Sequence, residues 1–212
     1  YVWDDPRDIN LIFESKLADY AGAKFAILTD CCTNGLYLSL QYRLLEKKLR
    51  GGQDISLPVQ SYVSVPMIIL QSGMNPVFVE EKWSGMYQLG ESGIWDSAAR
   101  FTEMMYVGGD ALQVLSFQIK KRLPIGRGGV ILTDDSSAYA WLKRAVYDGR
   151  DLTTPYADPG HVSQIGWHFY MTPEDAARGI LIMDALPKKN EDTMSYENYP
   201  PLDSYDYFGG KR

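Results

Sequence analysis

Cysteine and histidine are scarce in this chain of 212 residues, which has two of each. The two cysteines, Cys31 and Cys32, are adjacent, and neighbours in sequence rarely have the geometry of a disulfide. Two cysteines and two histidines that lie far from them in the sequence, His161 and His168, make no recognisable zinc motif, so we expect no metal centre. Free thiols are typical of a reducing compartment, and we therefore expect a cytoplasmic protein.

Long apolar runs and an excess of positive charge are also missing. No apolar run approaches the length of a membrane span, and no signal peptide opens the chain. The net charge of −6 argues against a broad nucleic-acid-binding face. We therefore expect neither a membrane nor a nucleic acid as a partner. At 45% hydrophobic and 23% charged residues, the composition is that of a globular domain large enough to fold without a disulfide or a metal.

Short apolar runs alternate with amphipathic segments along the chain. This alternation predicts an α/β domain over residues 1–187, with a mostly parallel sheet flanked by helices. Residues 81–93 are polar and rich in glycine with no clear period, and residues 188–212, with many Tyr and Asp, predict an extended C-terminal arm. The predicted strands are 25–29, 55–58, 77–79, 112–117 and 129–133; the predicted helices run from Asn10 to Gly22, through 36–44 to Gly51, over 63–71, from near Asp96, and over 138–147 and 173–186.

Polar residues gather at the ends of the predicted strands, where ligands bind in sheets of this class. Three strand ends, at residues 29–34, 58–62 and 96–99, carry polar or small residues. A fourth segment, 116–129, is rich in Lys, Arg and Gly. This layout predicts an anionic ligand but does not identify it.

One segment carries a family resemblance. It reads Ser116-Phe117-Gln118-Ile119-Lys120-Lys121, followed by Gly128-Gly129. It is similar to the DegT/DnrJ/EryC1/StrS family of pyridoxal-phosphate-dependent sugar aminotransferases, in which a lysine falls five residues after the serine. Lys121, rather than Lys120, thereby resembles the family's Schiff-base lysine. Four further blocks, at 25–36, 61–64, 95–99 and 166–171, resemble family blocks in the same order, which implies the fold-type-I aminotransferase fold and pyridoxal 5'-phosphate as cofactor.

The resemblance implies a role for each remaining site residue. Asp96 would pair with the pyridine nitrogen, while Ala98 and Tyr62 would pack on opposite faces of the ring. His168 stands where the family has an Asn that reaches the phosphate of the neighbouring subunit, which implies a homodimer with shared active sites. The residues implied to bind the phosphate are Cys32, Thr33 and Asn34 before a helix, together with Ser116 and Gln118.

The residues themselves leave simpler interpretations open. Without the resemblance, the Lys-Lys-Arg segment at 120–122 is typical of a solvated loop. Asp96 is typical of a helix N-cap, and Thr33 or Asn34 is typical of the N-cap of a second helix. His168 reads as a member of an aromatic cluster.

Lys121 needs a lowered pKa to act as a nucleophile, because only the neutral amine forms a Schiff base. We expect burial, or the charges of Lys120, Arg122 and Arg127, to lower it. The same lysine would serve as the general acid and base that moves a proton between substrate and cofactor.

The chain also departs from the family. Only 14 residues separate Glu80 from Trp95, where the family has a further strand-helix unit. We also expect the family's C-terminal small domain to be absent. Ala99 and Arg127 replace a His or Gln and a Glu of the family pattern. Such a reduced form resembles phage-encoded relatives that act in a bacterial host.

We therefore expect an aminotransferase that passes an amino group from a glutamate-like donor to a nucleotide-linked keto sugar through Lys121. The alternatives are a pyridoxal-phosphate enzyme of another reaction type and a non-catalytic binding or scaffold protein. We also expect the C-terminal arm, with the apolar and anionic strip 199–208, to cover the site.

Overall fold

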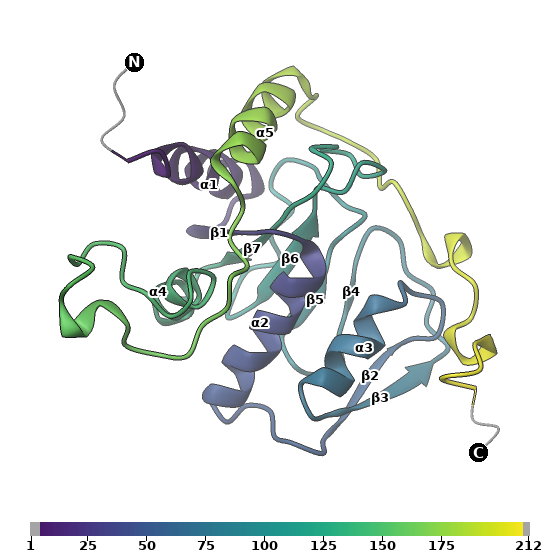
Figure 1. Ribbon diagram of the computed structural model, residues 1–212. Coiled ribbons are helices and arrows are strands. Elements are labelled where there is room, and N and C mark those ends of the chain that lie inside the picture. Colours follow the sequence, from purple (N-terminus) through teal and green to yellow (C-terminus); the bar gives the residue numbers. More distant parts are fainter. Residues whose placement is uncertain (1–4, 210–212) are drawn as a thin grey trace.

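The computed structural model describes residues 5–209 as an α/β fold with helices on both faces of a central sheet (Figure 1). Residues 1–4 of the predicted domain and 210–212 of the predicted arm lie outside the described residues. The strands are β1 (Phe25–Thr29), β2 (Asp54–Pro58), β3 (Asn75–Val79), β4 (Tyr87–Gln88), β5 (Ile94–Asp96), β6 (Leu112–Ser116) and β7 (Gly129–Thr133). The helices are α1 (Asp8–Ala21), α2 (Cys32–Leu45), α3 (Ser64–Gln71), α4 (Ser136–Ala145) and α5 (Pro173–Ala185), with 3-10 turns at Pro159–His161, Tyr196–Asn198 and Leu202–Ser204.

The central sheet has the strand order β1-β7-β6-β5-β4, and β2 and β3 form a separate parallel pair. Strands β5 and β6 are parallel, whereas β7 is antiparallel to both of its neighbours and β4 is antiparallel to β5. The predicted α/β class is confirmed, but the sheet is mixed rather than mostly parallel. The physical reason is the segment 117–128 between β6 and β7, which contains no helix, because a parallel return requires a crossover connection.

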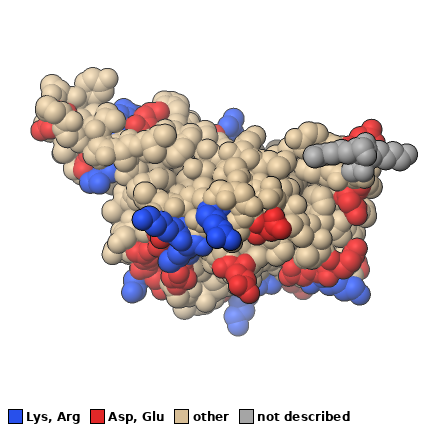
Figure 2. Space-filling model, turned by 90° about the horizontal axis from the view of Figure 1, so that it is seen from below, with Lys and Arg blue, Asp and Glu red and all other residues tan. Residues whose placement is uncertain are grey.

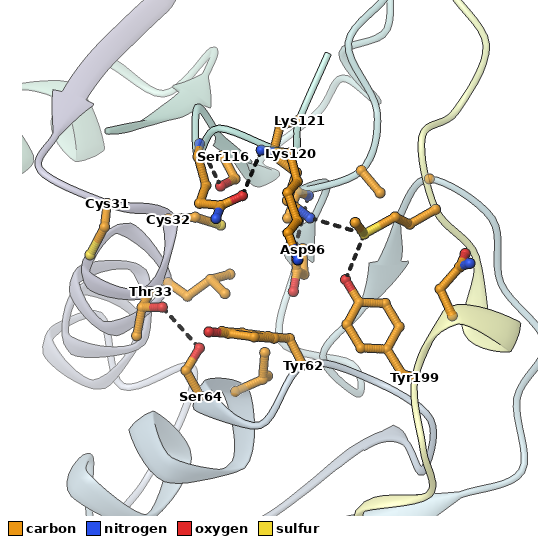
Figure 3. Close-up of a pocket in the computed structure, with 18 of the residues that line it drawn as sticks. Cys31, Cys32, Thr33, Tyr62, Ser64, Asp96, Ser116, Lys120, Lys121 and Tyr199 are labelled. Atoms are coloured by element: carbon orange, nitrogen blue, oxygen red, sulfur yellow. Dashed lines mark hydrogen bonds between the residues drawn. The ribbon is translucent and has the colours of Figure 1, made fainter. Parts of the chain in front are cut away.

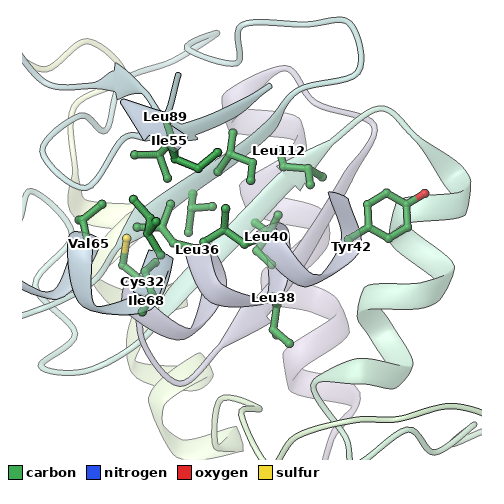
Figure 4. Packing of buried hydrophobic residues seen from close by; sticks show 14 of the residues in the cluster. Cys32, Leu36, Leu38, Leu40, Tyr42, Ile55, Val65, Ile68, Leu89 and Leu112 are labelled. Carbon is green, nitrogen blue, oxygen red and sulfur yellow. The ribbon is translucent and has the colours of Figure 1, made fainter. Parts of the chain in front are cut away.

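Two apolar clusters lie on opposite faces of the sheet. Leu36 and Leu40 of α2 pack with Leu112 of β6 on one face, and α3 contributes side chains to the same cluster (Figure 4). Phe13 and Leu17 of α1 pack on the other face together with part of α5. All five of these side chains are at most 1% exposed, so the sheet is a rigid platform that fixes the loops at its strand ends.

Several predicted elements need correction at their ends. Asn10 lies inside α1 rather than at its N-cap, which is Arg7, and its buried amide donates to the carbonyl of Met171 at 2.7 Å. Gly22 ends this helix, as predicted, in the left-handed conformation with φ of 80°. Helix α2 begins at Cys32, four residues before the first apolar residue of its predicted periodicity. Its first turn therefore contains the residues predicted to lie in the preceding loop.

The prediction of a helix that begins near Asp96 is wrong. Residues 97–111, all of them described, form turns and extended segments. Their backbone groups bond to other parts of the chain: the carbonyl of Ala99 accepts from Thr193 N, and Glu103 N donates to the carbonyl of Lys188. This segment is thus fixed by contacts with the C-terminal arm instead of by helical hydrogen bonds.

Charged side chains on the face seen from below are interspersed by sign, with Lys and Arg beside Asp and Glu (Figure 2). Between residues 5 and 209, none of the helices has the length and apolar character needed to cross a membrane.

Candidate active site

A cavity of about 470 Å³ lies where the C-terminal ends of β5 and β6 meet the N-terminus of α2 (Figure 3). The loop after β6, the start of α3 and the C-terminal arm complete its wall. Eight of the ten predicted site residues line this cavity: Cys32, Thr33, Tyr62, Asp96, Ala98, Ser116, Gln118 and Lys121. Segments from residue 32 to residue 121 therefore converge on one space, as the predicted site requires.

The other two predicted residues lie elsewhere. The amide of Asn34 donates to Asp30 Oδ1 at 2.7 Å, one helical turn back, and does not line the cavity. His168 is 69% exposed, and its Nδ1 lies 3.0 Å from Asp148 Oδ2. Its ring also meets the edge of Tyr170, so within its own chain it makes the aromatic contact that the simpler interpretation predicted.

Lys121 extends into the cavity from a turn in which its backbone N–H donates to the carbonyl of Gln118. Its Nζ lies 3.5 Å from the thioether sulfur of Met194 in the C-terminal arm. Burial lowers the pKa of this ammonium below its ordinary value, and the carboxylate of Asp96 opposes that shift. A lysine with a lowered pKa is a better nucleophile and proton carrier near neutral pH.

Two of the three neighbouring cations expected to lower this pKa have partners elsewhere. Arg127 forms an ion pair with Asp30 at 2.7 Å, and the guanidinium of Arg122 donates to the carbonyl of Glu191. Burial, not adjacent positive charge, is therefore the cause of the shift at Lys121.

Asp96 ends β5 with its side chain only 4% exposed. Its Oδ1 accepts from the backbone N–H of Ala98 at 2.9 Å, and its Oδ2 accepts from the hydroxyl of Tyr87 at 2.8 Å. Burial raises the pKa of this carboxyl, and the two hydrogen bonds, together with the charge of Lys121, oppose the rise. A buried carboxylate that has only neutral hydrogen-bond donors and faces a cavity is suited to receive a cationic N–H group.

The opposite part of the cavity is built on the first turn of α2. The Sγ of Cys31, the N-cap residue, accepts from Asn34 N at 3.4 Å, and the hydroxyls of Thr33 and Ser64 lie 2.8 Å apart. Gly129 allows this helix start to approach β7, because a Cβ there would stand 2.7 Å from Cys32 N. Helix N-termini with nearby hydroxyls are suited to bind phosphate.

Tyr62 and Ala98 line the cavity between these two ends, and Tyr62 is 56% exposed. A half-exposed aromatic ring and a small residue leave room for a flat ring. Together, the buried acid, the lysine with a lowered pKa and the helix N-terminus fit pyridoxal phosphate, whose ring nitrogen, aldehyde and phosphate need these three kinds of group.

The cavity residues that were not assigned from the sequence include Ser64, Trp83, Tyr87 and Met194. Ser64 stands at the end of the recognised block 61–64, so its position was a usable signal. Trp83 and Tyr87 belong to the segment 81–93, which has no periodicity. Met194 meets Lys121 across 73 residues of sequence, and no local pattern predicts such a contact.

The C-terminal arm, residues 188–209, runs along one side of the molecule and reaches the cavity (Figures 1 and 3). The Tyr199 hydroxyl donates to the sulfur of Met194 at 3.2 Å, and the Tyr199 carbonyl accepts from the amide of Gln60 at 3.0 Å. Leu202, which is 1% exposed, donates its N–H to the carbonyl of Val59. These contacts make the arm part of the cavity wall.

Residues 7–87 match the model of the DegT/DnrJ/EryC1/StrS aminotransferase family. A UDP-4-amino-4,6-dideoxy-N-acetyl-beta-L-altrosamine transaminase of Helicobacter pylori is 22% identical over 89% of this chain and 61% of its own length. The chain thus spans about three fifths of that curated relative.

Solved structures of similar fold include AtS13 from Actinomadura melliaura, with a TM-score of 0.69 and 18% identity over 87% of this chain and 61% of that one. Helicobacter pylori PseC, an aminotransferase involved in the biosynthesis of pseudoaminic acid, has a TM-score of 0.67 and 23% identity over 83% of this chain and 57% of that one. NtdA from Bacillus subtilis, solved with bound cofactor PMP, has a TM-score of 0.68 and 18% identity over 82% and 47%. The resemblance predicted from the sequence motifs and the fold that it implies are confirmed.

Proposed function

We propose, from this match to a family of aminotransferases, that the chain carries out pyridoxal-phosphate-dependent amino transfer. The donor would be an amino acid such as glutamate, and the acceptor a nucleotide-linked keto sugar, in keeping with the UDP-linked amino sugar in the name of the curated relative. The observation that carries the proposal is the placement of Lys121 and Asp96 in one cavity next to the N-terminus of α2.

Some residues of the cavity would bind the cofactor, and Lys121 would also transfer a proton. When bound, the protonated pyridine ring supplies an electron sink for the carbon that loses its proton. Asp96 would hold the proton on the ring nitrogen, and Tyr62 and Ala98 would orient the ring. The first turn of α2, which contains Cys32 and Thr33, would hold the phosphate together with Ser116 at the end of β6 and Gln118 in the loop that follows. Lys121 would anchor the cofactor and afterwards carry the proton.

Isotope-labelled glutamate tests this proposal directly. We expect protein supplied with pyridoxal phosphate to convert glutamate to 2-oxoglutarate, and to transfer the labelled nitrogen to a UDP-linked keto sugar. Mass spectrometry of the nucleotide sugar detects the label. Cofactor binding without labelled product would instead favour another reaction type, and the absence of cofactor binding would favour a non-catalytic protein.

We further propose that the protein is a homodimer with shared sites and that it lies in the cytoplasm of a phage-infected bacterial host. The exposed His168 supports the dimer, because its side chain lies outside the cavity of its own chain and stays 69% exposed although its Nδ1 contacts Asp148. The measured mass of the protein in solution tests this point, and a monomeric mass would exclude shared sites.

The division into a domain up to residue 187 and an arm that covers the cavity is also a proposal. Its support lies in Asp192, which forms a two-point ion pair with Arg100 at 2.8 and 2.9 Å. Arg100 lowers the pKa of the Asp192 carboxyl. The pairing is therefore complete above the ordinary carboxyl pKa and is lost as the pH falls through the lowered pKa of Asp192.

We expect Asp192→Asn to loosen the arm, so that proteases cleave residues 188–209 several times faster at pH 7 than in the unmodified protein. Limited proteolysis followed by mass spectrometry measures this rate. Asp184→Asn is the matched control, since it breaks the ion pair between Asp184 on α5 and Lys16 on α1, outside the arm. Equal cleavage rates for the two variants would show that the ion pair does not hold the arm.

A further inference from the structure

The side chain of Tyr87 is placed beside Asp96 by strand pairing. Strands β4 and β5 are antiparallel, and their register sets Tyr87 directly opposite Asp96. Directly opposed residues of an antiparallel pair project from the same face of the sheet. The hydroxyl of Tyr87 thereby reaches Asp96 Oδ2 at 2.8 Å. The segment 81–93, which has no clear period in the sequence, thus places Tyr87 in the wall of the cavity beside Asp96.

Packing fixes the ring of Tyr87 in this position. Tyr87 is 4% exposed, and its ring centroid lies 5.0 Å from that of Trp83. Trp83 is itself held by a hydrogen bond from its Nε1 to the carbonyl of Gln60 at 2.9 Å. Burial raises the pKa of the Tyr87 hydroxyl well above its ordinary value. The hydroxyl therefore remains protonated near neutral pH and acts as a hydrogen-bond donor.

Each oxygen of Asp96 has one donor. The N–H of Ala98 serves Oδ1, and the hydroxyl of Tyr87 serves Oδ2. A carboxylate held at both oxygens by fixed donors has a defined orientation and is favoured in its charged form. Among the other titratable groups, Lys121 acts on Asp96, and the charge of Asp96 in turn helps to raise the pKa of Cys32 on α2 and of Tyr199 on the arm.

We infer that Tyr87 is a positioning residue, whose hydroxyl holds the Asp96 carboxylate in the orientation in which it receives a cationic N–H group of the bound cofactor. The inference rests on the proposed function and extends it. It assigns to the hairpin β4–β5 a direct part in arranging the site, through the cross-strand pair of residues 87 and 96.

Tyr87→Phe tests the inference, because it removes one oxygen atom and keeps the ring against Trp83. We expect the affinity for pyridoxal phosphate and the kcat of the glutamate half-reaction each to fall about ten- to a hundredfold, as for a lost hydrogen bond to a charged group. The KM for glutamate should change less, because Tyr87 acts through Asp96. Without this donor the pKa of Asp96 rises, so the acid limb of the kcat profile should move to higher pH.

Tyr42→Phe is the matched control. Tyr42 is 5% exposed and donates to the carboxylate of Asp135 at 3.2 Å, outside the cavity. Both variants lose a hydrogen bond between a buried tyrosine and an aspartate, so comparable changes in the thermal unfolding midpoint are expected. Only Tyr87→Phe should change cofactor affinity and the pH profile.

A second measurement uses Asp96→Asn alone and together with Tyr87→Phe. If Tyr87 acts through the Asp96 carboxylate, adding Tyr87→Phe to Asp96→Asn should cost little further cofactor affinity. Additive losses, or a Tyr87→Phe protein that matches Tyr42→Phe in affinity, kcat and pH profile, would overturn the inference while leaving the proposed function intact. Unmodified protein that binds no cofactor would overturn the proposed function and this inference with it.

Discussion

Replacing Lys121 by alanine is expected to abolish amino transfer, with a fall in rate of at least about a thousandfold. The reason is that Lys121 would serve both as the covalent anchor of the cofactor and as the proton carrier. Its Nζ is the amine in the cavity whose pKa burial lowers. The visible absorbance of pyridoxal phosphate added to the protein, together with the rate of 2-oxoglutarate formation from glutamate, measures both consequences.

Lys120→Ala is the comparison variant, since it removes an adjacent charge of the same kind. The side chain of Lys120 is exposed, although it touches the rim of the same cavity. We expect Lys120→Ala to keep the absorbance of the bound cofactor that Lys121→Ala loses. Loss of that absorbance in Lys120→Ala, with retention in Lys121→Ala, would reassign the anchor to the neighbouring residue.

Asp96→Asn is expected to reduce the rate by about a hundredfold or more, because an amide keeps the size of the side chain but cannot hold a proton on the ring nitrogen by charge. The variant retains an acceptor for the N–H of Ala98, and its NH2 group can donate to the hydroxyl of Tyr87, which then accepts instead of donating. The loss should therefore appear in kcat, measured for the glutamate half-reaction, rather than in the fold.

Asp96→Asn is also expected to change the stability of the cofactor-free protein. Burial raises the pKa of Asp96, so folding favours its protonated form, and ionisation at neutral pH costs folding free energy. Asp96→Asn is therefore expected to be at least as stable as the unmodified protein at pH 7, with the difference shrinking as the pH falls towards about 4. Denaturant unfolding at both pH values measures this, and a strongly destabilised Asp96→Asn protein would show that the carboxylate is a structural group.

The positions of Lys121 and Asp96 in one cavity could be expected from the sequence because both lie in short blocks of recognisable residue order. Their chemical roles stay predictions. The strands were also accessible, since 25–29 and 129–133 are continuous apolar runs that coincide with β1 and β7. The antiparallel direction of β7 could have been anticipated, because residues 117–128 offer no crossover helix.

Other parts of the site had no local signal. Tyr87 reaches Asp96 through the register of a hairpin with a two-residue strand, which is too short to show a period. Met194 meets the cavity through a contact with Lys121, 73 residues away in the sequence. The turns at residues 97–111 are held by hydrogen bonds to the arm and to the end of α1, such as that from Met104 N to the carbonyl of Tyr20. The helix and strand propensities of residues 97–111 cannot predict these hydrogen bonds to distant parts of the chain.

Peptide mapping after borohydride reduction is the most direct measurement of whether this cavity holds pyridoxal phosphate on Lys121. The unmodified protein is incubated with pyridoxal phosphate, reduced, digested and analysed by mass spectrometry. We predict that a pyridoxyl group is found on the peptide that contains Lys121 and that fragmentation places it on that residue. Attachment to Lys120, attachment spread over surface lysines, or no attachment would contradict the assignment of the cavity as a pyridoxal phosphate site.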